Sequence, residues 1–213
     1  MATLLLISGR SGGMGPIVDG HPTSPNFLIR SRDYFIQAGF DVAVLGIPSD
    51  GIGLGGGDGR ISDAHMEDLR RVVQQLKAAT GLPVWAIGTS MGTISAAAAA
   101  IAFGQEELAG IVLTSSITSK AKPGAVPFQN LSAIRIPVLV LHHAFDNCKY
   151  CVPKAAEHIA DSLVNAPIKK FATIEGGNGG DGDTCGPWSH HGYIGIEQEA
   201  VRLVTDWIKN PTP

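Results

Sequence analysis

Six short apolar runs alternate along this chain with segments of helical spacing, and this alternation restricts the possible folds more than any other feature. The runs are rich in Val, Ile and Leu and end in turn residues, which is typical of strands buried on both faces. They cover residues 2–7, 40–47, 83–87, 110–114, 136–142 and 168–174, and helical spacing occupies 26–37, 62–79, 90–103, 153–164 and 192–209. This order predicts an α/β three-layer sandwich with a mostly parallel sheet of about six strands.

The length of 213 residues is that of one domain, so we expect a single domain over residues 1–213. The glycine-rich stretches 51–59 and 176–182 are expected to be loops within it. Basic residues are scattered and the net charge is −3, which argues against nucleic acid as a partner. The longest apolar stretch, 94–103, is shorter than the ~20 residues of a membrane span, so no span is expected.

The pentapeptide Gly88-Thr89-Ser90-Met91-Gly92 follows one predicted strand directly and precedes a predicted helix directly. This is the setting of the G-x-S-x-G turn, which holds a serine in a strained conformation at the carboxyl end of a sheet. A glycine-rich strand–helix turn without chemistry is the alternative. Ser90 is therefore the candidate nucleophile, and a serine nucleophile needs a base and an acid that orients this base.

Asp146 is the candidate acid because it follows the strand at 136–142, two strands after the serine turn. The competing carboxylates, Asp181 and Asp183, lie in the glycine-rich loop after the last strand, where solvated turn residues are common. His191 is the candidate base, since it lies after the last strand and before the final helix. The neighbouring His190 is the alternative, and His191 is preferred because a Gly–aromatic pair follows it and is expected to begin the helix.

A tetrahedral intermediate needs two backbone N–H groups that bind its oxyanion. One is expected from Met91, the residue after the nucleophile. The other is expected from the loop Gly9–Gly13 after the first strand, with Arg10 as the choice and Ser11 as the alternative.

These residues resemble the α/β-hydrolase superfamily, and most closely its small lid-less bacterial members. The resemblance covers residues 4–208 and rests on three motifs: Pro48-Ser49-Asp50, the Gly-Thr-Ser-x-Gly turn at Ser90, and His-His-Gly-aromatic from His190. It implies a Ser-Asp-His triad of Ser90, Asp146 and His191 and ester-type hydrolysis. Larger relatives begin with an antiparallel hairpin, but here the first strand begins at residue 2, so a reduced sheet is expected.

The segment 115–135 is too short for the cap domain that many relatives insert there. An open site follows, which favours small or short-chain esters as substrates, cleaved through an acyl-enzyme without a cofactor. Thioester, lactone or amide hydrolysis on the same triad is an alternative, and a catalytically silent binding protein is another.

The sequence contains two further motifs. The glycines from Gly51 to Gly56 fit G-x-G-x-x-G, but no helix begins there, so a dinucleotide site is rejected. Cys148 and Cys151 form C-x-x-C without a second pair, which argues against zinc, and no metal is expected. If Asp146 and His191 meet, the loops of Cys148 and Cys185 also meet, which predicts a disulfide and an exported protein. Free thiols would instead indicate the cytoplasm.

Overall fold

The computed structural model describes residues 1–49, 53–180 and 182–213. Its main sheet has six parallel strands in the order β4-β1-β5-β6-β7-β8, which confirms the predicted α/β sandwich with a reduced sheet. In chain order the strands are β1 (Thr3–Ile7), β4 (Asp41–Val44), β5 (Val84–Thr89), β6 (Gly110–Thr114), β7 (Val138–His143) and β8 (Lys169–Ile174).

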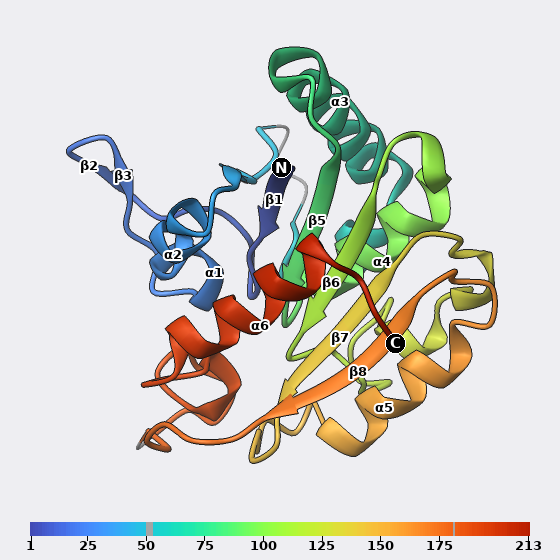
Figure 1. Ribbon diagram of the computed structural model, residues 1–213. Helices are drawn as coiled ribbons and strands as arrows, with labels where there is room; N and C mark the ends of the chain where they lie inside the picture. Colours follow the sequence, from blue (N-terminus) through green and yellow to red (C-terminus); the bar gives the residue numbers. More distant parts are fainter. Residues whose placement is uncertain (50–52, 181) are drawn as a thin grey trace.

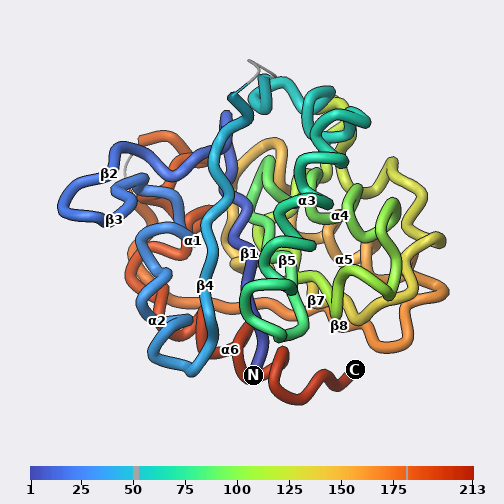
Figure 2. Tube along the Cα trace, turned by 90° about the horizontal axis from the view of Figure 1, so that it is seen from above, coloured from blue at the N-terminus to red at the C-terminus, as the bar shows by residue number. Residues whose placement is uncertain are grey.

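Helices cover both faces of the sheet (Figures 1 and 2). One face carries α1 (Phe27–Arg30), α2 (Arg32–Gln37) and α6 (Glu197–Lys209), and the other carries α3 (Asp63–Thr80), α4 (Gly92–Phe103) and α5 (Pro153–Ser162). Successive side chains of a strand point to opposite faces. In β1, Leu4 and Leu6 therefore enter the core beneath α6, while Leu5 and Ile7 enter the core beneath α3 and α4.

Two elements at the start of the chain differ from the prediction. The helix expected over 26–37 is broken at Ser31, whose N–H bonds back to the carbonyl of Phe27 and closes α1. A hairpin of β2 (Ile17–Val18) and β3 (His21–Pro22) was not predicted. Its strands have two residues each and are largely exposed, so they leave no hydrophobic pattern in the sequence.

The final helix begins later than predicted, at Glu197 instead of residue 192. Residues His190–Gly192 form a short 3₁₀ turn, and Tyr193 follows with φ 59°. A left-handed residue cannot continue a helix, so the Gly–aromatic pair ends a turn and does not begin α6. The expectation that this pair begins the helix after His191 was therefore wrong.

The segment between β6 and β7 contains only two 3₁₀ turns, η3 (Val126–Phe128) and η4 (Leu131–Ala133), which confirms the expected lack of a cap domain. Among the described helices, none combines the length and apolar character needed to cross a membrane.

Candidate active site

Ser90 lies in the turn between β5 and α4, with a φ of 53°. This left-handed conformation costs a non-glycine residue on the order of 1 kcal/mol or more. The Ser90 N–H donates a 3.0 Å hydrogen bond to the carbonyl of Thr114, and its carbonyl accepts one from the Thr93 hydroxyl at 2.6 Å. Bonds on both sides of the serine thus hold the strained turn.

Glycines allow the turn to approach its neighbours. A side chain at Gly92 would overlap the backbone carbonyl of Ile7 in β1. A Cβ atom at Gly88 would lie 2.5 Å from the carbonyl oxygen of Gly92, and one at Gly9 would lie 3.0 Å from Cβ of Ser90. The loop after β1 therefore passes directly beside the serine.

Asp146 follows β7, and its side chain is completely buried. One carboxylate oxygen, Oδ2, lies 2.9 Å from Nδ1 of His191. The other, Oδ1, accepts the N–H of Cys148 at 2.9 Å. Because both oxygens are bonded, the carboxylate is held in one orientation towards the histidine.

The competing acids do not take this place among the described residues. Asp183 is exposed and forms an ion pair with Arg10 at 2.6 Å, while its other oxygen accepts the N–H of Cys185. Asp181 lies outside the described residues. The structure thus brings Asp146 and not Asp183 to His191.

His191 and His190 have different surroundings. The ring of His190 stacks on that of His143, with centroids 4.2 Å apart. His191 is the one that bonds Asp146. A neutral imidazole that donates its Nδ1–H to a carboxylate keeps a lone pair on Nε2, as a general base requires.

Three hydrogen bonds fix the backbone around His191. Its N–H donates to the Ser189 hydroxyl at 3.2 Å, and its carbonyl accepts from the Ser115 hydroxyl at 2.8 Å. The Arg30 guanidinium donates to the carbonyl of Gly192 at 2.6 Å. Ser115 and Arg30 were missed from the sequence, because each is one of many residues of its type and only the fold shows what it contacts.

His142, at the end of β7, packs behind the acid. Its Nε2 accepts the N–H of Ser116 at 2.7 Å, so the remaining proton belongs on Nδ1. Complete burial lowers the pKa of His142 to about 4, although the nearby Asp146 charge acts in the opposite direction. His142 is therefore neutral beside the acid.

Met91 and Arg10 are the two residues predicted to donate their backbone N–H groups to an oxyanion. Within the described residues, neither the Met91 N–H nor the Arg10 N–H donates a hydrogen bond to the protein. Both residues line a cavity of about 540 Å³ together with Ser90, while Ser11 lines the neighbouring cavity. The arrangement can bind an oxyanion beside the serine.

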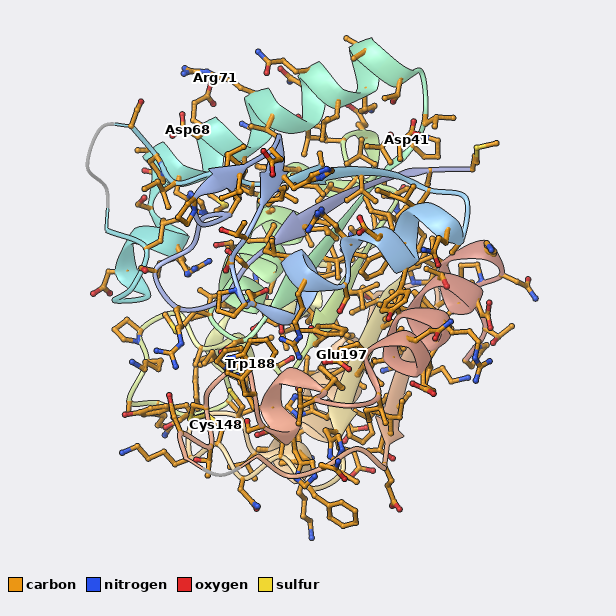
Figure 3. All side chains as sticks on the ribbon, turned by 90° about the vertical axis from the view of Figure 1, so that its left-hand side faces the viewer. Asp41, Asp68, Arg71, Cys148, Trp188 and Glu197 are labelled. Carbon is orange, nitrogen blue, oxygen red and sulfur yellow. A yellow bond between two sulfur atoms is a disulfide. The ribbon has the colours of Figure 1, made fainter. Side chains whose placement is uncertain are left out.

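Two cavities meet at Ser90. The one of about 280 Å³ extends towards the β2–β3 hairpin and also borders His191. The one of about 540 Å³ extends towards Ile117 and Tyr150. Figure 3 shows Cys148, which lines the larger cavity, at the end of the molecule opposite Asp41, the first residue of β4. The cavities therefore open at the carboxyl ends of the strands, where α/β proteins bind ligands.

The His191 ring makes one hydrogen bond among the described residues, the one to Asp146. Ser90 and His191 border the same cavity but are not hydrogen-bonded to each other. In unliganded sites such contacts are often long and shorten when substrate binds.

Cys148 and Cys185 form a disulfide with a Cα–Cα distance of 4.6 Å, so the loop that carries Asp146 and the loop that precedes His191 are joined covalently. Cys151 is a free, buried thiol near Ser90 that the sequence did not assign to the site. Burial raises the pKa of Cys151 well above its usual range, and the Asp146 charge adds to this.

Sulfur atoms of Cys148 and Cys151 lie within 4.8 Å of a His191 nitrogen. The disulfide occupies Cys148, however, and leaves too few ligands for zinc.

Two further predictions involve residues outside the described part of the chain. The first concerns the Pro-Ser-Asp motif, whose last residue is Asp50. The second concerns the G-x-G-x-x-G pattern, which begins at Gly51.

The structure is similar to several solved hydrolases at low sequence identity. A lid-less α/β serine hydrolase from Xanthomonas campestris is 17% identical, with a TM-score of 0.61 over 95% of this chain and 82% of that one. An esterase from Pyrococcus furiosus is 14% identical, with a TM-score of 0.66 over 98% and 82%. A monoglyceride lipase from Saccharomyces cerevisiae is 13% identical, with a TM-score of 0.67 over 100% and 87%. No protein-family model and no curated protein matches the sequence.

Proposed function

We propose that this chain, which has the α/β-hydrolase fold, is a serine hydrolase. It would cleave carboxylic esters through an acyl-enzyme. The observation that carries the proposal is the hydrogen bond between Asp146 and His191 at the cavity of a strained Ser90. A histidine–carboxylate pair with a purely structural role would not require a serine with positive φ beside it.

In the first step, Ser90 Oγ attacks the ester carbonyl carbon while Nε2 of His191 takes the hydroxyl proton. Asp146 holds the ring and stabilises the imidazolium that forms. The carbonyl oxygen becomes an oxyanion and accepts hydrogen bonds from the N–H groups of Met91 and Arg10, which have no other partner among the described residues. His191 then returns the proton to the alcohol as the C–O bond breaks.

In the second step, water repeats the attack on the acyl-enzyme. His191 removes a proton from the water, and the second tetrahedral intermediate uses the same two N–H groups. Its collapse expels Ser90 Oγ, which regains the proton, and a carboxylic acid leaves. No cofactor takes part in this sequence.

The two cavities support small or short-chain substrates. Both border Ser90, so one can hold the acyl group and the other the alcohol. The segment between β6 and β7 supplies no cap to enclose a long chain.

The test is hydrolysis of p-nitrophenyl acetate, butyrate and octanoate by the wild type and by Ser90→Ala. We expect turnover that falls with chain length and is lost in the variant. A fluorophosphonate probe should label the wild type at Ser90. A folded protein that shows neither turnover nor labelling would contradict the proposal and favour a binding role.

We also propose that the protein works in an oxidising compartment, outside the cytoplasm, because disulfides persist there. Peptide mapping of protein isolated without reductant from its native cells should recover Cys148 linked to Cys185. Recovery of both as free thiols would refute this part.

A further inference from the structure

Arg60 is a buried cation close to the candidate site. It lies in the 3₁₀ turn η1 (Asp58–Ile61) and has no exposed surface. Charged side chains are rarely buried without a partner of opposite charge, because their desolvation costs several kcal/mol. Among the described residues, no carboxylate forms an ion pair with Arg60, so other contacts must offset this cost.

The guanidinium finds these contacts in neutral oxygen atoms. Nε donates to the carbonyl of Leu54 at 2.8 Å, and Nη1 donates to the Ser95 hydroxyl at 3.1 Å. Nη2 donates to two carbonyls of the loop after β1, that of Ser8 at 3.1 Å and that of Arg10 at 3.0 Å. Arg60 therefore joins the 53–61 segment and helix α4 to the loop that passes Ser90.

The two carbonyls bonded by Nη2 lie on either side of the peptide unit that carries the Arg10 N–H. The Arg10 N–H belongs to the peptide between Gly9 and Arg10, the carbonyl of Ser8 to the peptide before it, and the carbonyl of Arg10 to the peptide after it. The Gly9 carbonyl accepts the N–H of Gly12 at 2.9 Å. Arg10 itself has a φ of 50°, which is strained for a non-glycine residue. All three carbonyls are thus bonded, while the Arg10 N–H has no partner among the described residues and belongs to a residue that lines both cavities.

We propose that Arg60 is a positioning residue for ester hydrolysis: it holds the strained loop so that the Arg10 N–H points at the oxyanion, and it places a positive charge behind that loop. The proposal rests on the proposed function, since it concerns the same oxyanion. Arg60 acts through the backbone of the loop and does not contact the substrate.

Within residues 1–49, 53–180 and 182–213, no carboxylate is paired with this charge. Burial lowers the pKa of Arg60 to about 10, so the guanidinium remains protonated at neutral pH. Ser95 accepts from Arg60 and lies 2.9 Å from Nε2 of His65. Burial and the Arg60 charge lower the pKa of His65 to about 4, so His65 is neutral. A fixed cation in a medium of low polarity stabilises a developing negative charge more than an exposed one does.

The experiment compares Arg60→Met, Arg60→Lys and a matched control, Arg70→Met. Arg70 is a partly buried arginine that bonds Glu107 and the carbonyl of Ala102, away from the cavities. Two quantities are measured: kcat and KM for p-nitrophenyl acetate, and the rate of hydrogen exchange at the Gly12 amide. Urea unfolding sets the conditions so that each variant is more than 99% folded.

We expect Arg60→Met to lower kcat about 100-fold with KM changed less than about threefold, as the loss of an oxyanion donor does. Arg60→Lys should recover about tenfold of this loss, because an ammonium group can still reach one of the two carbonyls. Exchange at Gly12 should be at least tenfold faster in Arg60→Met. Arg70→Met should match the wild type in kcat and in Gly12 exchange.

A folded Arg60→Met with wild-type kcat would overturn the proposal, and so would an equal loss in Arg70→Met. If Arg60→Met does not fold, Arg60→Lys decides: wild-type kcat and wild-type Gly12 exchange in this variant overturn the proposal. If the wild type cleaves no ester and Ser90 is not labelled, the proposed function fails. Gly12 exchange then still decides whether Arg60 holds the loop.

Discussion

The imidazole of His191 and the carboxylate of Asp146 are joined by a 2.9 Å hydrogen bond between residues 45 positions apart in the chain. The same carboxylate accepts the N–H of Cys148, whose sulfur is bonded to Cys185. The loop that carries Asp146 and the segment that leads to His191 are therefore connected by a hydrogen bond and by a covalent bond.

Replacing Asp146 by Asn should lower kcat/KM for p-nitrophenyl acetate on the order of 10³- to 10⁴-fold. The amide nearly keeps the size of the carboxylate, but it cannot stabilise an imidazolium and can select the wrong tautomer of His191. Asp183→Asn is the matched control and should stay within about threefold of the wild type, since Asp183 is exposed and pairs with Arg10. Equal losses in both variants would contradict the assignment of the acid.

Gly92→Ala should destabilise the protein by about 2 kcal/mol or more, because the added methyl group would overlap the Ile7 carbonyl and separate α4 from β1. Gly56→Ala is a suitable control, as no atom of the described residues lies within 4 Å of the position of its Cβ and its φ is not left-handed. The free energy of unfolding in urea measures both. A Gly92→Ala protein as stable as Gly56→Ala would mean that the close approach is absent.

Replacing Cys148 and Cys185 together by Ser should lower the free energy of unfolding by about 3–4 kcal/mol, given their separation of 37 positions. Activity should fall as well, because the loops of Asp146 and His191 lose their link. Cys151→Ala should leave the disulfide in place, which non-reducing peptide mapping can verify. Unchanged stability in the double variant would argue that the disulfide does not form in solution.

Stability should decrease as the pH falls below about 6.5. His142 is neutral when folded, with its pKa lowered to about 4, whereas in the unfolded chain it takes up a proton near pH 6.5. The unfolded state therefore binds more protons between these values, and the contribution of His142 present at pH 7 is lost towards pH 4. Urea unfolding at pH 7 and pH 4.5 should show a decrease of about 2 kcal/mol from His142 alone. In His142→Gln, which keeps an acceptor for the Ser116 N–H, the decrease should be smaller by that amount.

The layered fold could be predicted from the sequence because it depends on local pattern. Each buried strand reads as an apolar run, and all six runs are strands in the structure. Strand β4 is the least accurate, with four residues where eight were expected, because its register with β1 covers only Asp41–Val44 although the apolar pattern continues to Ile47. The hairpin at 17–22 was missed, since exposed strands of two residues have no hydrophobic period.

The candidate site was predictable where a residue type has a fixed place in the topology. Ser90 is marked by its glycines, and Asp146 by the strand before it. The contacts that hold them were not predictable, because they depend on which distant carbonyl meets which donor. Arg60 is the clearest case: an arginine next to glycines reads as an exposed loop residue, and only the fold shows it buried against Ser8 and Arg10.

The short connection between β6 and β7 affects which step would limit the rate of the proposed reaction. Under the proposed function, products do not wait for a domain between β6 and β7 to open, so bond making or diffusion should limit the rate. An enzyme without such a domain would not be activated at an oil–water interface. Its rate should therefore rise smoothly as the substrate concentration passes the solubility limit. Under the proposed function, bulk water is not excluded by a cap, and the packed interior beneath Ser90 must supply the low polarity around the oxyanion.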